Sequence, residues 1–122
     1  MTETLFQKYG GFPTLTGVVI TLYDKVLASN QIGKFFEDVD IKRLMDHQAK
    51  FIASMLGGPV SYPNDRLRHI HGHLGISDMD FDEMSKLLGE ALKEHGFEPV
   101  DCDAVMHEIE ALRSYVVSQG AG

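Results

Sequence analysis

Apolar residues recur every three or four positions along most of this chain, the spacing that places them on one face of an α-helix. The first such stretch begins near Pro13, a residue suited to a first helical turn, and continues to about residue 29. After a short turn over residues 31–36, a second stretch begins at Asp40, which can cap a helix. The pair Gly57-Gly58 and the proline after it predict the end of this second helix.

The second half of the chain predicts two more long helices. Residues 59–66 contain two prolines and an asparagine and predict a loop, followed by a brief helical piece over about 66–73. Ser77, with an acidic residue three positions later, signals the start of a strongly amphipathic helix that ends at Gly96. Pro99 can open the last helix, whose inner face carries four apolar residues: Val105, Ile109, Leu112 and Val116. Nothing alternates with period two for long, so the predicted fold class is all-α.

Size and charge narrow the function classes. A chain of 122 residues suits a single domain over residues 1–122. Its 11 basic and 18 acidic side chains give a net charge of −7, which makes nucleic acids and anionic membranes poor partners. No apolar run approaches the roughly 18 residues of a membrane-spanning helix, and the first residues lack a signal-peptide pattern, so we expect a cytoplasmic protein.

The one cysteine argues against thiol chemistry. Cys102 has no second cysteine with which to form an internal disulfide, which agrees with a reducing cytoplasm. Asp101 and Asp103 flank it, and we expect their negative charges to raise the pKa of the thiol and so disfavour a reactive thiolate. Cys102 is therefore expected to be a small structural residue near the start of a helix.

Two polar residues fall on helix faces that are otherwise apolar. Gln48 lies four residues after Leu44 and three before Phe51, and Tyr23 lies close to the apolar stripe of the first long helix. A buried amide or phenol without a partner costs about 1–3 kcal/mol, so each should be hydrogen-bonded. The two side chains can bond each other or a backbone carbonyl, or both can point at a small polar ligand in a mostly apolar pocket.

Six histidines offer further chemistry, and the run His69-x-His71-x-His73 is the most unusual arrangement. Solvated positions on amphipathic helices explain His95 and His107. In a strand all three histidines of the run share a face and could hold zinc, whereas in a helix only His69 and His73 share a side. The neighbouring apolar residues have helical spacing, which leaves His71 apart from the other two. A single imidazole of this kind can be the protein ligand of a haem iron.

Short motifs follow one another along the chain in a specific order. They are Tyr9-Gly10-Gly11, the segment 22–28, Phe35-Phe36, Leu44 with His47-Gln48 and Phe51, Leu56-Gly57-Gly58-Pro59, Tyr62, the segment 67–76 and Phe81. Gly-Gly-Pro alone is a weak signal, whereas the ordered set, with a Phe-Phe pair before the second long helix and a histidine about 35 residues later, is highly specific. Over most of residues 5–117 this set resembles the group I truncated haemoglobins, small relatives of the globins.

The resemblance implies a sandwich of two helices over two, with a very short first helix and a proximal segment that is mostly loop. It implies that His71 binds the iron of haem b (iron protoporphyrin IX) and that Phe36 packs on the porphyrin face. Tyr23, Leu44 and Gln48 match the distal positions around a gas on the iron. The remaining haem contacts are matched by six residues: Phe51, Tyr62, Leu67, Ile76, Phe81 and Leu88.

The implied function is reversible binding of dioxygen, with nitric oxide and carbon monoxide as further ligands. A hydrogen bond from Tyr23, supported by the Gln48 amide, is worth about 1.5–3 kcal/mol and would slow dioxygen release about 10–150-fold. In some relatives a histidine at the position of His47 becomes a sixth iron ligand. The alternative for His47 is a solvent-exposed residue near a haem propionate. We expect a monomer.

The residues leave three other functions open. Nitric oxide dioxygenation would need an external reductase, because the chain has no GxGxxG motif for a nicotinamide or flavin nucleotide. A non-haem metal site could use His69, His73 and a carboxylate such as Asp65, although two histidines supply only half of a tetrahedral zinc site. The third alternative is a bundle with a purely structural role.

Overall fold

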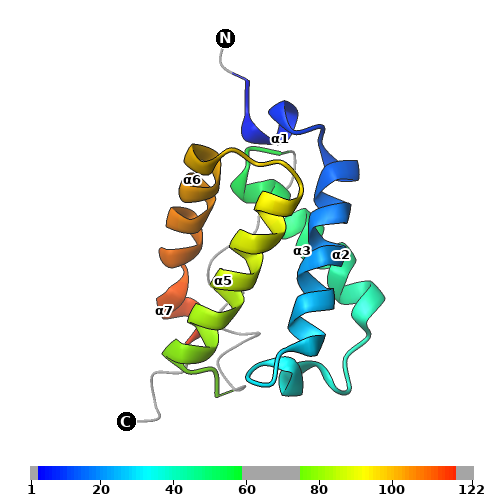
Figure 1. Ribbon diagram of the computed structural model, residues 1–122, viewed down its shortest axis with the longest axis vertical. Helices are drawn as coiled ribbons and strands as arrows, with labels where there is room; N and C mark the ends of the chain where they lie inside the picture. Colours follow the sequence, from blue (N-terminus) through cyan, green and yellow to red (C-terminus); the bar gives the residue numbers. More distant parts are fainter. Residues whose placement is uncertain (1–2, 59–74, 118–122) are drawn as a thin grey trace.

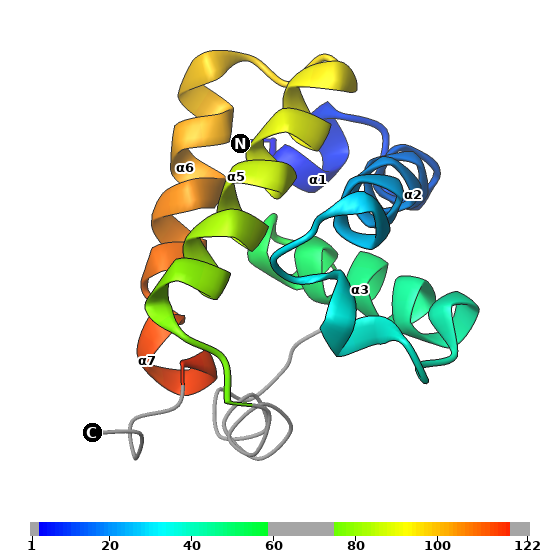
Figure 2. The same cartoon turned by 60° about the horizontal axis from the view of Figure 1, so that its bottom comes forward.

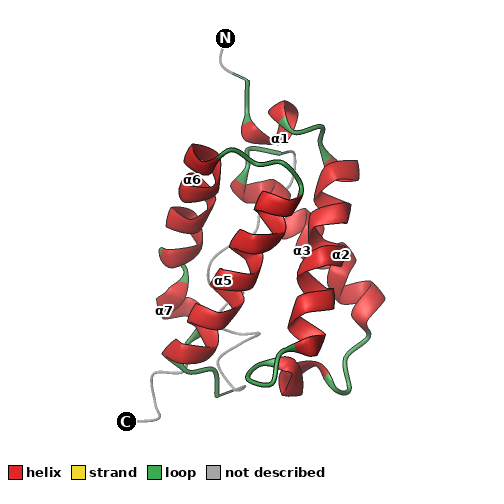
Figure 3. Ribbon diagram, viewed as in Figure 1, coloured by secondary structure: helices red, strands yellow, loops and turns green. Residues whose placement is uncertain are grey.

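The computed structural model describes residues 3–58 and 75–117, and every regular element in these ranges is helical (Figures 1 and 3). In chain order the elements are α1 (Leu5–Lys8), α2 (Phe12–Ala28), the 3-10 helix η1 (Gly33–Phe36), α3 (Ile41–Met55), α5 (Asp78–Glu94), α6 (Pro99–Glu110) and α7 (Arg113–Val116). The predicted all-α class is confirmed. Within these ranges no helix combines the length and the apolar content needed to span a bilayer.

Two pairs of helices build the fold. α2 packs against both α3 and α5, and α6 runs antiparallel beside α5 (Figure 1). Figure 2 shows that α3 runs at a steep angle to α5. The two pairs are therefore α2 with α3 and α5 with α6. This arrangement is the sandwich of two helices over two that the resemblance implies, and the four-residue α1 is its very short first helix.

The hydrophobic core lies where α2 meets its neighbours. The largest side chains that are fully buried come from α2, α5 and α6, and they are Leu15, Val18, Val19, Val26, Leu92 and Val105. Full burial of such a side chain contributes about 1.5–3 kcal/mol, so this cluster fixes how α2 and α5 face each other. The same two helices carry several of the predicted site residues, whose positions are therefore set by the core.

Capping residues define where the helices begin, as the sequence predicts. The Asp40 side chain accepts a hydrogen bond from the backbone N–H of Arg43 at 3.2 Å and starts α3. Ser77 and Asp80 form a reciprocal capping box at the start of α5, with bonds of 3.1 and 3.0 Å. At the end of α3, Gly57 has φ of +86°, a left-handed conformation that glycine adopts without steric cost.

The beginning of the chain is fastened to α6. The ring of Tyr9 stacks on Phe97 with 3.8 Å between centroids, and its hydroxyl donates a short hydrogen bond to Asp101. Lys8 Nζ lies 2.7 Å from the same carboxylate and 2.8 Å from Glu98. Hydrogen bonds from Lys8 and Tyr9 hold the pKa of the Asp101 carboxyl below its ordinary value.

The last helix differs from the prediction, because it is interrupted. α6 ends at Glu110, and the chain turns at Ala111 and Leu112 before α7 begins at Arg113. Neither turn residue is glycine or proline, so no local signal predicts the break. After the break, Arg113 binds the start of α5, as described below.

His95 also differs from the prediction, because it is not a solvated residue. It is half-buried at the end of α5, and its Nε2 lies 2.8 Å from Oγ1 of Thr21 in α2. Its ring packs on Gly17, where a methyl group would come within 2.9 Å of Cε1. This contact joins residues 74 positions apart, which helical periodicity does not reveal. His107 is exposed, as expected.

Cys102 is a buried residue near the start of α6, as expected. The pKa of its thiol is raised, but the main cause is burial, and the flanking Asp103 and Asp101 only add to it. The thiol lies 3.7 Å from the carbonyl oxygen of Phe97. The predicted direction of the shift is therefore confirmed, while the predicted cause is secondary.

Candidate functional site

Tyr23 is the most informative of the predicted site residues. Its side chain projects from α2 and is only 2% exposed, next to Phe36, whose ring it meets at 77° with centroids 5.6 Å apart. Among the described residues no side chain or backbone group forms a hydrogen bond with the Tyr23 hydroxyl. Burial raises the pKa of Tyr23, so the phenol keeps its proton and remains a donor. The predicted alternative in which Tyr23 and Gln48 bond each other is not observed.

The turn after α2 positions Phe36. Backbone N–H groups of Gln31 and Ile32 both donate to the Ser29 hydroxyl at 3.3 Å, which shapes the turn. Ile32 is 2% exposed and anchors this turn in the core, and η1 follows directly. The serine and the buried isoleucine together direct the Phe36 ring toward Tyr23.

The remaining distal residues lie along α3. Leu44, Gln48 and Phe51 follow one another at intervals of four and three residues, and all three are half-buried, whereas Ile52 faces the core. The Gln48 amide forms no side-chain hydrogen bond with the residues that the structure describes. His47 lies on the exposed side of the same helix.

α5 carries two further predicted haem contacts on one face, here called the α5 wall. Phe81 and Leu88 lie seven residues apart, two turns along one face, and are 7% and 4% exposed. Leu88 belongs to the continuous core cluster. Of the described buried apolar residues, Phe81 alone stands outside that cluster. Ile76, half-buried, comes just before this helix.

Two hydrogen bonds link the turn before η1 to α5. Gln31, in the turn before η1, donates from Nε2 to Oδ1 of Asp80 in α5 at 3.2 Å, and Ser29 donates to Glu83 at 2.9 Å. Burial alone would raise the pKa of Asp80, but hydrogen bonds from Ser77 and Gln31 bring it below its ordinary value. The charged carboxylate therefore fastens the turn that carries Phe36 to the helix that carries Phe81. Sequence reasoning missed this link, because the partners are 49 and 54 positions apart.

Several predicted residues fall outside the described ranges. They are the predicted iron ligand and two haem contacts, His71, Tyr62 and Leu67, together with the residues of the non-haem alternative, His69, His73 and Asp65. Within residues 3–58 and 75–117, no three His, Cys, Asp or Glu side chains gather into a metal-binding group. The described part of the site consists of the distal residues and the α5 wall.

Comparison with known proteins decides the family. A family model described as "Bacterial-like globin" matches residues 4–118. A curated "Group 1 truncated hemoglobin" from Tetrahymena pyriformis is 30% identical over 106 residues, which cover 87% of this chain and 84% of the relative. This chain belongs to the group 1 truncated haemoglobins. The GlbN truncated haemoglobin of a Synechocystis strain is 33% identical over 98 residues, covering 77% of this chain and 79% of that relative.

Solved truncated haemoglobins share the fold. The Fe(III) form from Tetrahymena pyriformis superposes with a TM-score of 0.88 at 26% identity, covering 96% of this chain and all of that one. A truncated haemoglobin from Chlamydomonas reinhardtii gives a TM-score of 0.82 at 30% identity, covering 98% of this chain and 99% of the other. Membership implies a haem cofactor and haem-based gas binding for this truncated haemoglobin.

The described residues fit such a group. A haem protein that binds a polar gas needs a donor in an otherwise apolar, water-poor site. The Tyr23 phenol is such a donor, because the side chain is only 2% exposed and its hydroxyl has no partner among the described residues. No fully buried side-chain oxygen or nitrogen in the described ranges lacks a partner, so the Tyr23 hydroxyl keeps some accessible surface, at which a ligand can accept a hydrogen bond. This truncated haemoglobin therefore has, in its described part, the polar atom that the cofactor's ligand requires.

Proposed function

We propose that this truncated haemoglobin binds dioxygen reversibly at haem b and retains it through Tyr23. The observation that carries the proposal is the hydroxyl of the buried residue Tyr23, which has no hydrogen-bond partner among the described residues. When bound, the haem supplies a ferrous iron that takes a diatomic gas as ligand. The phenol would donate to the outer atom of that gas, with the Gln48 amide as its support.

The other residues have binding and shaping roles in this proposal. His71 would hold the iron from the proximal side, and Phe36 would pack against the porphyrin while contacting Tyr23 at its edge. Leu44 offers no hydrogen bond, which leaves Tyr23 as the main donor. Nitric oxide and carbon monoxide are smaller ligands of the same site and depend less on a donor.

Sixth ligation by His47 is a separate part of the proposal. Its side chain is on the exposed side of α3 and would have to turn inward to reach the iron. A gas would then compete with an intramolecular imidazole, and its apparent affinity would fall by the fraction of open sites. A five-coordinate, high-spin ferrous spectrum without added ligand would eliminate ligation by His47.

Nitric oxide dioxygenation is the second candidate function. The same Tyr23 donor favours it, because dioxygen must stay in the site until nitric oxide arrives. Dioxygen and nitric oxide combine to nitrate only with one added electron, which the ferrous haem would supply. A separate reductase would then have to return the haem to its ferrous state. Slow, non-stoichiometric nitrate formation after rapid mixing with nitric oxide would argue against it.

The visible spectrum of the purified protein, oxidised and reduced, tests the proposal. We expect a Soret band that shifts on addition of dioxygen or carbon monoxide and that is lost in His71→Gly. His107→Ala removes an exposed histidine and should leave the spectrum unchanged. A colourless protein, or one containing zinc in place of haem, would contradict the proposal.

We also propose a cytoplasmic location, which rests on the single, buried cysteine.

A further inference from the structure

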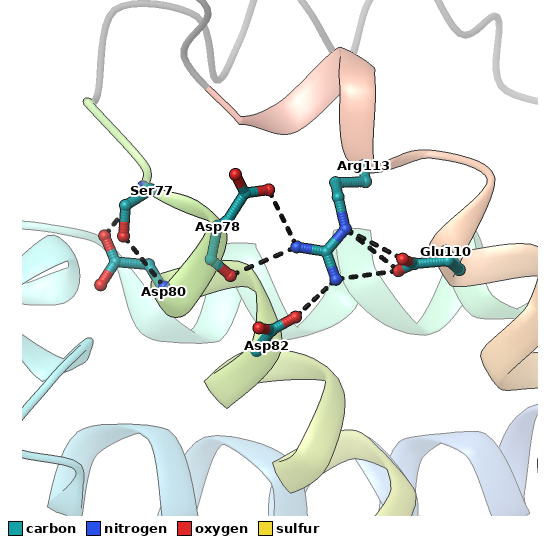
Figure 4. A network of polar contacts seen from close by, with 6 residues as sticks. All are labelled: Ser77, Asp78, Asp80, Asp82, Glu110 and Arg113. Carbon is teal, nitrogen blue, oxygen red and sulfur yellow. Dashed lines mark hydrogen bonds and ion pairs between the residues drawn. The ribbon is translucent and has the colours of Figure 1, made fainter. Parts of the chain in front are cut away.

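Arg113 joins α7 to the first turn of α5 (Figure 4). Its Nη1 lies 3.0 Å from Oδ1 of Asp78 and 3.3 Å from the backbone oxygen of the same residue. Its Nη2 lies 2.5 Å from Oδ1 of Asp82, and Nε and Nη2 both bond Glu110 at 3.0 Å. The planar guanidinium thus holds two residues of α5 and one of α6 at once, which a point charge such as lysine cannot do.

The same guanidinium covers Phe81. Its Cζ lies 4.6 Å from the centroid of the Phe81 ring, within the range of a cation–π contact. Phe81 is buried but is not a member of the continuous core cluster. Arg113 is the described cation that packs on it, and the three carboxylates determine where the guanidinium sits.

The carboxylates and the ring contact have different roles. Asp78, Asp82 and Glu110 have side chains that are 71%, 63% and 60% exposed, and together they form a network that sets the position of one guanidinium. The Arg113 side chain is 26% exposed, and one face of its guanidinium covers a buried ring. The carboxylates therefore orient Arg113, and Arg113 acts on Phe81 through the ring contact.

We propose that Arg113 is a positioning residue for the haem pocket, which holds the Phe81 ring in place and thereby slows haem loss. This inference rests on the proposed function, because Phe81 is one wall of the proposed pocket. Substitution of Arg113 frees the Phe81 ring. This loosens the α5 wall without removing any residue that would touch the haem.

Haem transfer to an excess of apomyoglobin tests the inference, with the Soret circular dichroism as a second reading. A cation–π contact of about 1–2 kcal/mol corresponds to about five- to thirtyfold, so Arg113→Ala should lose haem faster by that factor. Its Soret dichroism should also change, because that signal depends on nearby aromatic rings. Arg113→Lys keeps the positive charge but lacks the planar guanidinium, so its rate of haem loss should lie between those of the parent protein and Arg113→Ala. Lys93→Ala, an equal charge change at the far end of α5, should match the parent protein in both readings.

A double-mutant cycle separates positioning from general stabilisation. If Arg113 acts through the ring, Arg113→Ala should add nothing to the haem loss of Phe81→Leu. Equal rates for the parent protein and Arg113→Ala would overturn the inference, as would a full additional effect in the Phe81→Leu background. A parent protein without a Soret band would instead overturn the proposed function itself.

Discussion

The phenol ring of Tyr23 meets the ring of Phe36 nearly at right angles, at 77° with 5.6 Å between centroids. This edge-to-face contact holds the aromatic ring by its carbon atoms and leaves the hydroxyl to other partners. Packing and hydrogen bonding are therefore separable at Tyr23, because removing the oxygen leaves the ring contact intact.

Tyr23→Phe should accelerate dioxygen release tenfold or more. The variant deletes one hydrogen bond of about 1.5–3 kcal/mol to a partly charged acceptor while keeping the buried ring. Stopped-flow replacement of dioxygen by carbon monoxide measures the rate. Tyr9→Phe deletes a phenol just after α1 and should leave release unchanged. An unaltered rate in Tyr23→Phe would remove Tyr23 from the mechanism.

Gly17→Ala should lower the free energy of unfolding by about 1–2 kcal/mol, although alanine favours a helix by about 1 kcal/mol. The new methyl group would lie 2.9 Å from Cε1 of His95 and push the ring away from Thr21. The matched Gly89→Ala, where the nearest atom is the Met106 sulfur at 3.4 Å, should be neutral or stabilising. Urea-induced unfolding of the parent protein and both variants measures the differences in the free energy of unfolding.

The cost of Gly17→Ala should disappear in a His95→Ala background, since the clash is with that ring. A cost that persists in the double variant would place its origin elsewhere in α2. The comparison also measures what the His95–Thr21 contact contributes between α2 and α5.

Asp101 should make the fold sensitive to acid. Its pKa is lower in the folded chain than the ordinary value near 3.9, so its stabilising effect is complete above about pH 4 and is lost as the pH falls further. We expect Asp101→Asn to be less stable than the parent protein at pH 7, with a difference that shrinks in acid. Unfolding by urea over a pH series measures this. The exposed neighbour Asp103→Asn is the control, and a difference independent of pH would contradict the account.

Cys102 should react very slowly with iodoacetamide in the native protein and rapidly in denaturant. The side chain is 3% exposed, and burial raises the pKa of the thiol, so both access and thiolate are scarce. Mass spectrometry of timed samples gives the two rates. Native labelling as fast as that of the unfolded chain would show that α6 opens readily.

Local signals in the sequence predicted most of the fold. A helix begins at or near each of four predicted start signals, Pro13, Asp40, Ser77 and Pro99. Capping and the preference of proline for the first helical turn depend only on neighbouring residues, so the sequence reveals them. The short α1 begins with a capping box at Thr4, whose signal, a threonine followed by glutamine three residues on, is also local. That box is readable in the sequence, but only the resemblance led us to expect a short first helix.

The site was predictable only in part. Tyr23 and Gln48 were detectable as polar residues on apolar faces, and the structure buries Tyr23 and half-buries Gln48. The contacts of Gln31 with Asp80 and of Arg113 with Phe81 were not, because each joins residues more than thirty positions apart. Periodicity identifies which face of a helix is buried, but not which distant side chain will meet it.

The fastening of the chain's beginning to α6 has a consequence for biosynthesis. Phe6 can bond the Leu56 carbonyl once α3 has been made, but Lys8 and Tyr9 must wait for Asp101, more than ninety positions later. On the ribosome, this opening segment therefore keeps an aromatic ring and an ammonium group without their native neighbours until α6 emerges. Closure of the N-terminal turn is thus a late event, and a nascent polypeptide halted before α6 would lack it.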